Sequence, residues 1–366
     1  MSTETIPALR RHTEPVVAYV GRDVPREVLG AAGFTPVRLA GRPGPSPLAD
    51  RYCGPGIDAV ARTQLEQVLT GRLADCVGLV ISGDCDGSVR LFRYLREIQR
   101  LEPAPGVPPF TFLDLLHLPY RTSTCYNAVR LDQLIGELEG WAGHAITDER
   151  LTEQVRLGNE IRALGARLRH LREDPAGPRL TGLQTLRILR DGSRLSPEAY
   201  RDRLGRLVEE AGEPARHEGV RVFLTGSSHD HDQAYRLIED HGAVIVGEDH
   251  DWGALDAPVD ETGDVRTALV AAYGRGAPSS TGFGIAERAA YTARRATAAG
   301  AQVVICWLRQ DDDAPAWDVP AQKEALAMAG IPLVALPPQP YDRPDPTLGP
   351  LIAREIAAAL SAGARP

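Results

Sequence analysis

The chain has 366 residues, of which 43% are hydrophobic and 25% are charged, and its formal net charge is −8. This balance is that of a globular protein, so wholesale disorder and collagen-like repeats are excluded. No basic stripe predicts nucleic-acid binding, and no apolar run reaches the roughly 18 residues of a membrane helix. The first residues lack the apolar stretch of a secretory signal, so we expect a cytoplasmic protein.

The first third of the chain alternates strand-like and helix-like segments. The continuous apolar run VGLVIS is typical of a strand that is buried on both faces of a parallel sheet. The expected elements are a strand at 16–21, a helix and a second strand within 25–40, a helix at 58–71, a strand at 77–82, a helix after 83–88 and a strand at 110–116. Such alternation predicts a parallel α/β domain, which we assign to residues 1–126.

The middle of the chain is almost purely helical. Apolar residues recur with helical spacing through 127–172 and again through 181–212. Thr147 stands at the start of one helical run and is expected to be its N-cap, because its hydroxyl can accept from a backbone N–H of the first turn. We therefore expect a helical linker or cap over residues 127–215.

The last part returns to alternation. The expected elements are strands at 219–227, 243–249, 301–308 and 332–337, a helix closed by Gly242, helices at 287–301 and 322–331, a loop at 309–320 and a closing helix at 348–363. This pattern predicts a Rossmann-like C-terminal α/β domain over residues 216–366. The fold expected for the whole chain is therefore two parallel-sheet α/β domains joined by a helical segment.

Five cysteines are present, at positions 53, 76, 85, 125 and 306. An odd number of widely spaced cysteines argues against a disulfide framework, and the absence of CxxC argues against a zinc ribbon or a ferredoxin loop. Any metal site would be assembled from distant parts of the chain. Cys76 is interpreted as structural, and Cys125 as structural or facing a partner.

Cys85 lies in GDCDGS, between a buried strand and a helix, which is where sites form in open α/β sheets. The positive end of the helix favours a thiolate there, whereas Asp84 and Asp86 disfavour one. A metal-bound thiolate would resolve the conflict, and a small buried residue in a turn is the other interpretation. Cys53 stands in the tight, glycine-rich turn RYCGPG before a helix, and a cysteine in such a turn is more often functional than one inside a strand.

Other polar groups follow the strands of the second domain. His and Asp residues cluster at 227–232 and 247–253, and Asp311, Asp312 and Asp313 follow the strand that contains Cys306. Each group is either a set of metal or proton-transfer ligands or a solvated loop. Cys306 itself is expected to pack as a small hydrophobe within its strand. Neither a GxSxG elbow nor a P-loop is present.

The order of the motifs resembles one family. It runs from PREVLGAAGFTPVRLAG through Cys53 and the Cys85-Asp86 pair to LEGWAGHAITDERLTEQVRLGNEIR, then YRLIEDHGAVIVGEDHDWG, WDVP and GIPLVAL. Over about Val17–Ala359 this series is similar to the subunits of the 2-hydroxyacyl-CoA dehydratase and benzoyl-CoA reductase family. The resemblance implies two Rossmann-like domains and a homologous second subunit that forms a heterodimer with this one.

The resemblance also implies a cofactor and a chemistry. It implies a [4Fe-4S] cluster, a separate ATP-dependent activator that donates a low-potential electron, and an acyl-CoA thioester that becomes a ketyl radical or carries an aromatic ring to be reduced. Cys53 and Cys85 match two cluster cysteines. The third falls on Asp312 when counted back from WDVP, and Cys306, six residues earlier, is the alternative ligand. Carboxylates are poorer ligands for such clusters than thiolates.

Two main hypotheses follow. In the first, the chain is a cluster-bearing dehydratase or reductase subunit whose ligands are Cys53, Cys85 and Asp312, with Asp86 orienting the Cys85 loop. In the second, it is a cluster-free, non-catalytic subunit that shapes the substrate cleft beside an active partner. A third option is a protein of two Rossmann-like domains that binds a nucleotide-like molecule without redox chemistry.

Overall fold

The computed structural model describes residues 14–54, 56–211, 216–253, 257–278 and 283–363. It confirms the predicted fold class, because it contains two four-stranded sheets in which every strand pair is parallel. The chain divides into two compact units. Unit 1 comprises Met1–Ala163, Asp191–Asp202 and Asp256–Gly276, and unit 2 comprises Leu164–Arg190, Arg203–Leu255 and Ala277–Pro366.

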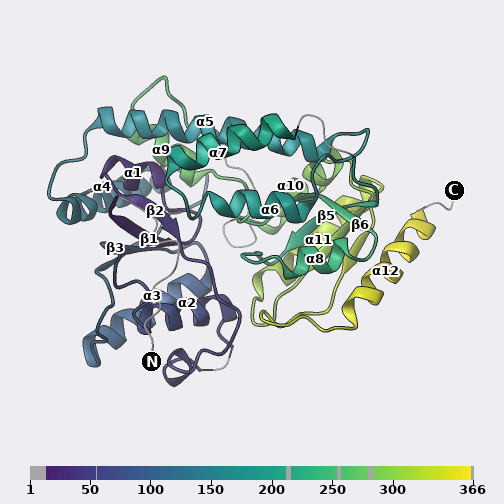
Figure 1. The fold of residues 1–366 in the computed structure, drawn as a ribbon, viewed down its shortest axis with the longest axis horizontal. Coiled ribbons are helices and arrows are strands. Elements are labelled where there is room, and N and C mark those ends of the chain that lie inside the picture. The colour runs from purple at the N-terminus through teal and green to yellow at the C-terminus, as the bar shows by residue number, and fades with distance from the viewer. Residues whose placement is uncertain (1–13, 55, 212–215, 254–256, 279–282, 364–366) are drawn as a thin grey trace. The chain divides into compact units, whose positions relative to one another are not determined.

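The sheet of unit 1 has the strand order β2-β1-β3-β4, shown in purple and blue in Figure 1. Its strands are β1 (Val16–Val20), β2 (Thr35–Arg38), β3 (Gly78–Ser82) and β4 (Phe110–Leu113). Every residue of β1 and β3 is buried, as expected for apolar runs in a parallel sheet that is covered on both faces.

Two apolar cores cover the two faces of that sheet. Alternate residues of β1 point to opposite faces, so Val16, Ala18 and Val20 pack with α2 and α3, whereas Val17 and Tyr19 pack with α1, α4, α5 and α9. The helices of this unit are α1 (Arg26–Ala31), α2 (Ala59–Leu69), α3 (Asp86–Leu101), α4 (Arg121–Ala142), the first part of α5 (Asp148–Glu173) and α9 (Val265–Gly274).

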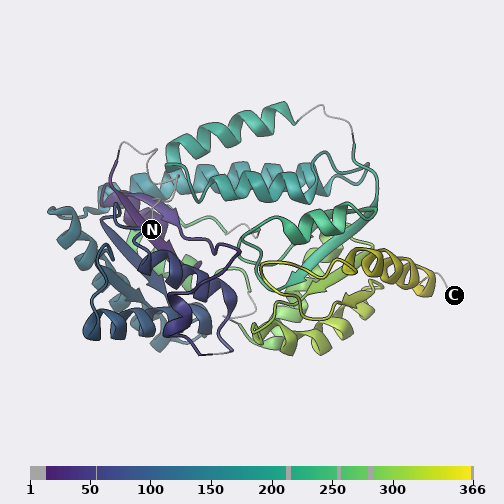
Figure 2. The ribbon, with the colours of Figure 1, turned by 60° about the horizontal axis from the view of Figure 1, so that its bottom comes forward.

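Unit 2 repeats the same strand order, as β6-β5-β7-β8. Its strands are β5 (Val220–Gly226), β6 (Ala243–Glu248), β7 (Val303–Trp307) and β8 (Leu333–Ala335). Helices α6 (Gly182–Asp191), α8 (Gln233–Glu239) and α12 (Leu348–Gly363) cover one face, and α10 (Ile285–Ala298) and α11 (Ala314–Met328) cover the other. Figure 2 shows this sheet between its two helical layers. Helix α7 (Pro197–Glu210) contributes residues to both units.

Local signals explain where several helices begin. The Thr147 hydroxyl accepts from the Arg150 N–H at 3.4 Å, which confirms Thr147 as the N-cap of α5. The predicted loop at 309–320 is wrong in its second half, because α11 already begins at Ala314 with a proline in its first turn, a position that proline favours. Helix α9 was not expected, although the Asp264 carboxylate caps it by accepting from the Thr267 N–H at 2.8 Å.

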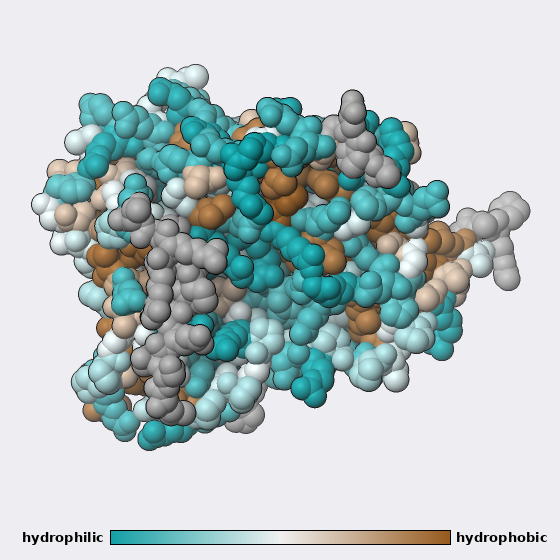
Figure 3. Space-filling view, in the orientation of Figure 1, coloured by the Kyte–Doolittle hydropathy of each residue, from teal (hydrophilic) through white to brown (hydrophobic). Residues whose placement is uncertain are grey.

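The surface of the molecule is largely hydrophilic on the face that Figure 3 shows, where apolar residues form separate patches. Within the part of the chain that the structure describes, no helix combines the length and the apolar character that a membrane crossing requires.

Candidate functional site

The carboxyl edge of the unit 1 sheet brings two loops into close contact. Gly21 follows β1 with φ +94°, and a Cβ on it would lie 2.6 Å from the Ser82 Cβ and 2.8 Å from an Asp84 oxygen. The loop after β3 therefore lies against a backbone position that tolerates no side chain. Asp84 stabilises this contact between the two loops, because its carboxylate accepts a hydrogen bond from the Arg22 N–H at 2.8 Å.

Cys85 is the N-cap of α3. Its sulfur accepts from the Ser88 N–H at 3.3 Å, and the Ser88 hydroxyl donates to Asp84 at 3.0 Å. Burial raises the pKa of the Cys85 thiol far above its usual range, and the Asp84 carboxylate adds to the rise. As the protein stands, Cys85 is therefore a protonated thiol rather than an activated nucleophile.

The two carboxylates beside Cys85 have different surroundings. Asp86 is 75% exposed and pairs with Arg90 at 2.6 Å, one turn along α3. The residue that orients the Cys85 loop is Asp84, through Arg22 and Ser88, rather than Asp86 as the sequence had suggested.

Cys53 lies in the connection between β2 and α2, two residues after the short helix η2 (Ala49–Arg51), and is half-buried. Burial raises the pKa of its thiol, with opposing contributions from Arg62 and Asp50. A Cβ on Gly87 in the first turn of α3 would lie 3.3 Å from the Ala61 Cβ and 3.6 Å from the Asp58 Cβ, so the starts of α2 and α3 pack together. Both predicted cysteines therefore lie in loops that lead into this pair of helix starts.

A histidine that the sequence analysis missed lies at the same edge. One ring nitrogen of His117 is 2.8 Å from an Asp23 carboxylate oxygen, and the other is 3.2 Å from the Gly274 carbonyl oxygen. Both partners are acceptors, so the ring donates from both nitrogens and is positively charged. Burial opposes this charge, but the hydrogen bond and charge of Asp23 outweigh it and raise the pKa of His117. No local pattern marks this residue, because Asp23 and Gly274 are far away in the sequence.

The corresponding loop of unit 2 follows β7 and contains Asp312. Its carboxylate pairs with Arg309 at 3.2 Å, and the Arg309 guanidinium also donates to the Ser228 carbonyl at 2.8 Å and lies over the Tyr341 ring. Arg309 is 8% exposed and its backbone N–H donates to the Ser227 hydroxyl at 2.9 Å. Asp312 is thus engaged with a buried cation.

Cys306 is fully buried within β7, as the sequence predicted for a small apolar residue of a strand. Burial raises the pKa of its thiol to about 12, and Asp249 and Asp318 contribute to the rise. Asp249 accepts from the Thr225 hydroxyl at 3.0 Å and from the Thr292 hydroxyl at 2.5 Å, while Asp318 accepts from Arg288 at 3.0 Å. Both carboxylates near this thiol are therefore already hydrogen-bonded.

The two His/Asp clusters of unit 2 lie in the interior. His250 accepts from the Trp252 N–H at 3.3 Å, so its other nitrogen donates to the Tyr235 oxygen at 2.8 Å and Tyr235 donates to Glu248 at 3.1 Å. Burial lowers the pKa of both His229 and His250, so both rings are neutral. His229 packs edge-on against the rings of His250 and Trp307.

The donor set does not complete an iron–sulfur site within either unit. Unit 1 offers the two thiols Cys53 and Cys85 at its carboxyl edge, and unit 2 offers a carboxylate held by Arg309 and the thiol of Cys306 inside a strand. Clusters of this kind are held by four ligands, as a rule thiolates. Among the described residues, no three His, Cys, Asp or Glu side chains gather in an arrangement that could hold a metal ion.

Two parallel α/β units with one strand order, each with polar loops at its carboxyl edge, define a protein of two Rossmann-like domains. Residues 23–337 match the family model of the 2-hydroxyglutaryl-CoA dehydratase D-component, and the chain belongs to this family. That match includes the strands from β2 to β8 and confirms the family resemblance seen in the sequence.

Two relatives show how far this similarity extends. The (R)-phenyllactyl-CoA dehydratase beta subunit of Clostridium sporogenes is 23% identical over 317 residues, which cover 85% of this chain and 83% of the relative. The (R)-2-hydroxyglutaryl-CoA dehydratase subunit beta of Acidaminococcus fermentans is 23% identical over 331 residues, which cover 86% and 84%. Each relative thus corresponds to this chain over most of its length.

Proposed function

We propose that this chain is one subunit of a two-subunit enzyme that dehydrates a 2-hydroxyacyl-CoA thioester. The observation that carries the proposal is the D-component match over residues 23–337, which runs from the helix after β1 through β8 and includes the loops after β3 and β7. Both relatives are named as beta subunits of dehydratases that act on CoA thioesters. The complex would be completed by a homologous subunit and by an ATP-dependent activator that donates the electron.

Exposed apolar side chains support a partner subunit. Five large ones follow β4 within 116–129, on the loop into α4 and on the first turns of that helix, and their exposed fractions range from 39% to 61% (Leu116, Leu118, Tyr120, Tyr126 and Val129). Apolar and aromatic groups that cluster on a surface are typical of protein interfaces. We call this set the 116–129 patch.

Within the complex, we propose that this chain is the cluster-free subunit and that its partner carries the [4Fe-4S] cluster. Two observations support this role: the Asp312 carboxylate is engaged by Arg309, and the Cys306 thiol is buried within β7, so neither of the two expected ligands of unit 2 is available. In this role the carboxyl-edge loops of the chain shape the substrate site and exclude water from it.

The second candidate is a cluster bound by this chain through Cys53 and Cys85, with Asp312 or Cys306 as a further ligand. The position of both cysteines in loops that lead into the packed starts of α2 and α3 favours it. Such a cluster would supply low-potential electrons to the thioester. Asp312 would first have to leave Arg309, which makes this candidate the less favoured one.

Iron and acid-labile sulfide, measured after anaerobic purification, separate the two candidates. For the cluster-free role we expect no iron in the chain alone, and iron in the heterodimer that is unchanged by Cys85→Ser. About four iron atoms in the chain alone, lost in Cys85→Ser but kept in the exposed control Cys125→Ser, would establish the second candidate instead.

Dehydration itself is tested with the reconstituted heterodimer and its activator. We expect a 2-hydroxyacyl-CoA to be converted to the 2-enoyl-CoA, followed by mass spectrometry as a loss of water. A heterodimer with a loaded cluster that converts no 2-hydroxyacyl-CoA would contradict the proposed function.

A further inference from the structure

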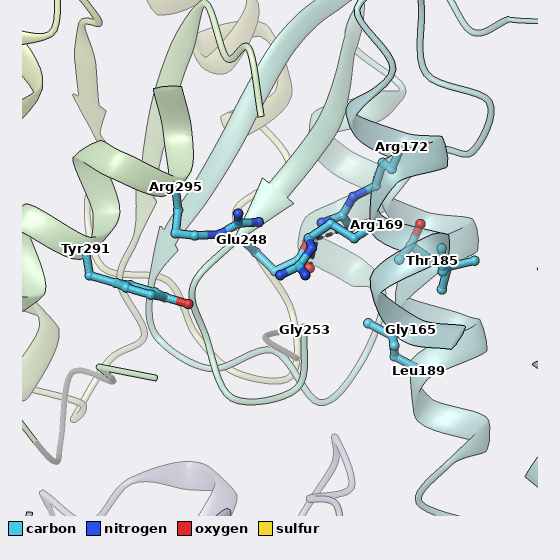
Figure 4. Close-up of a pocket in the computed structure, with 10 residues that line it drawn as sticks. Gly165, Arg169, Arg172, Thr185, Leu189, Glu248, Gly253, Tyr291 and Arg295 are labelled. Carbon is cyan, nitrogen blue, oxygen red and sulfur yellow. Dashed lines mark hydrogen bonds and ion pairs between the residues drawn. The ribbon is translucent and has the colours of Figure 1, made fainter. Parts of the chain in front are cut away.

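A pocket within unit 2 is lined by basic side chains that the sequence analysis did not single out. Figure 4 shows Arg169 and Arg172 from α5, Glu248 from the end of β6, and Tyr291 and Arg295 from α10 around this space. Gly253 forms part of the wall, and a Cβ on it would lie 2.2 Å from the Glu248 Cγ. The wall is thus formed by backbone that is packed closely against the carboxylate.

Two of the three arginines are neutralised by carboxylates. Arg172 forms a two-pronged ion pair with Glu248, with both N–O distances at 2.8 Å, and both side chains are buried. Burial opposes ionisation of Glu248, but Arg172 outweighs it and keeps the pKa of that carboxyl below its usual value. Arg295 pairs with Glu173 at 2.7 Å.

Arg169 is the exception. It is half-buried, and its guanidinium forms no hydrogen bond or ion pair with any residue in the described part of the chain. Burial lowers its pKa, and the positive charge of Arg295 lowers it further. Glu173, which does not line the pocket and is paired with Arg295, opposes this lowering only in part. Three guanidiniums therefore line one pocket with a single carboxylate, Glu248, so the lining carries an excess of positive charge.

We propose that this pocket binds a phosphate group, with Arg169 as its principal contact. Guanidinium groups reach the space from two helices, and the three terminal oxygens of a phosphate can accept from both, whereas a carboxylate has two oxygens. The phosphate is either free inorganic phosphate or the 3′-phosphate of CoA. The CoA source rests on the proposed function, whereas the phosphate site itself does not.

Calorimetry with the full-length chain tests the proposal, with inorganic phosphate, CoA and dephospho-CoA as probes at constant ionic strength. We expect Arg169→Ala to weaken binding of inorganic phosphate by about 10- to 100-fold, because a charged hydrogen-bonding partner is lost. Arg169→Lys should retain part of the affinity. Arg167→Ala is the matched control, because Arg167 is exposed on the same helix and does not line the pocket.

The probes also distinguish the two sources. If the phosphate belongs to CoA, CoA binds more tightly than dephospho-CoA and loses this advantage in Arg169→Ala. If CoA and dephospho-CoA bind alike while phosphate depends on Arg169, the site is for free phosphate. The proposal is overturned if phosphate does not bind, or binds equally well to wild type and Arg169→Ala. Phosphate binding is measured without turnover, so failure of the proposed dehydratase activity leaves this result unaffected.

Folding of the variant is checked by its thermal midpoint without ligand. We expect Arg169→Ala to unfold at the temperature of wild type or slightly above it, because removal of Arg169 relieves repulsion from Arg295. Phosphate should raise the midpoint of wild type and of Arg167→Ala but not that of Arg169→Ala, because a ligand stabilises only the state that binds it.

Discussion

The loops after β3 and β7 occupy equivalent places in two sheets of the same strand order, yet they carry different chemistry. In unit 1 the loop ends in Cys85, a half-buried thiol that caps α3 beside Asp84. In unit 2 the loop carries Asp312, which pairs with Arg309. One topology thus positions a group at the carboxyl edge of each sheet, and the side chains around it decide whether that group is available to a ligand.

We expect the largest loss of stability from substitutions of the glycines against which the neighbouring strand ends and loops pack. A Cβ on Gly226 would lie 2.3 Å from the Trp307 carbonyl oxygen, whereas one on Gly21 would meet the side chains of Ser82 and Asp84. We expect Gly226→Ala to cost about 3–5 kcal/mol of unfolding free energy, because backbone cannot move aside, and Gly21→Ala about 2–4 kcal/mol. Urea denaturation followed by hydrogen exchange of each unit measures both.

Gly242→Ala is the control for this pair. Gly242 also has a positive φ, of +86°, but no atom lies within 4 Å of a Cβ placed there. Its substitution should cost only about 1 kcal/mol, for the backbone conformation alone. Equal losses of unfolding free energy in all three variants would show that the close approach of neighbouring atoms adds nothing to the cost of the substitution.

We expect the Arg309–Asp312 ion pair of unit 2 to contribute more to the free energy of unfolding than the Asp86–Arg90 ion pair of unit 1. Arg309→Ala is expected to cost about 2–4 kcal/mol, because it leaves the Ser228 carbonyl and Asp312 without a buried donor, and Asp312→Asn about 1 kcal/mol. Asp86→Asn, which breaks an exposed pair on α3, should change stability by less than about 0.5 kcal/mol. A larger loss for Asp86→Asn than for Arg309→Ala would reverse the comparison.

The two units should respond to pH in opposite directions. The pKa of His117 is raised in the folded protein, so its stabilisation is present below about pH 6.5, the usual value for histidine, and is lost as the pH rises through the raised pKa. The pKa of His229 is lowered, so its unfolded form binds more protons and stability falls as the pH drops below about 6.5.

The opposite pH dependences of stability are tested with single variants, whose urea midpoints are measured at pH 5.5, 7 and 8.5. His117→Gln should destabilise unit 1 by about 1–2 kcal/mol at pH 5.5 and by less at pH 8.5. His229→Phe should reduce the loss of stability that unit 2 shows at low pH. If His117→Gln costs more at high pH than at low pH, the charged state assigned to His117 is wrong.

The smallest effect on stability is expected at the surface. Leu118→Ser and Tyr120→Ser in the 116–129 patch should change the free energy of unfolding by less than about 0.5 kcal/mol, yet weaken association with the partner subunit by about tenfold or more. Trp317→Ser and Met328→Ser, at exposed positions of α11, are the comparison in unit 2. If they weaken association and the unit 1 variants do not, the partner binds unit 2.

Several features of the molecule were predicted because they depend on neighbours in the sequence. The strand at 77–82 is a continuous apolar run, and Thr147 and Cys85 stand directly before helical patterns. The start of α11 was misjudged because residues 309–320 were interpreted as a loop, whereas the helix begins at Ala314 with Pro315 in its first turn, a position that proline favours.

The candidate site was only partly predictable. The sequence placed Cys85 after a strand and Cys53 in a turn before a helix, but it could not show that Asp312 pairs with Arg309. His117 and Arg169 were missed because their surroundings come from segments far apart in the chain: Asp23 and Gly274 for the first, and α10 for the second. An excess of positive charge in a pocket becomes visible only when all the side chains that line it are in place.

By itself the sequence determined two parallel α/β sheets and the family of the chain, because the alternation of strands and helices and the order of the motifs follow from local hydrophobic patterns and short segments. Only the tertiary structure decided which polar groups at the sheet edges already form hydrogen bonds or ion pairs and which could bind a ligand. Burial and pairing set the protonation of Cys85 and His117, and the positions of neighbouring charges set the surroundings of Arg169. All of these depend on residues that folding brings together.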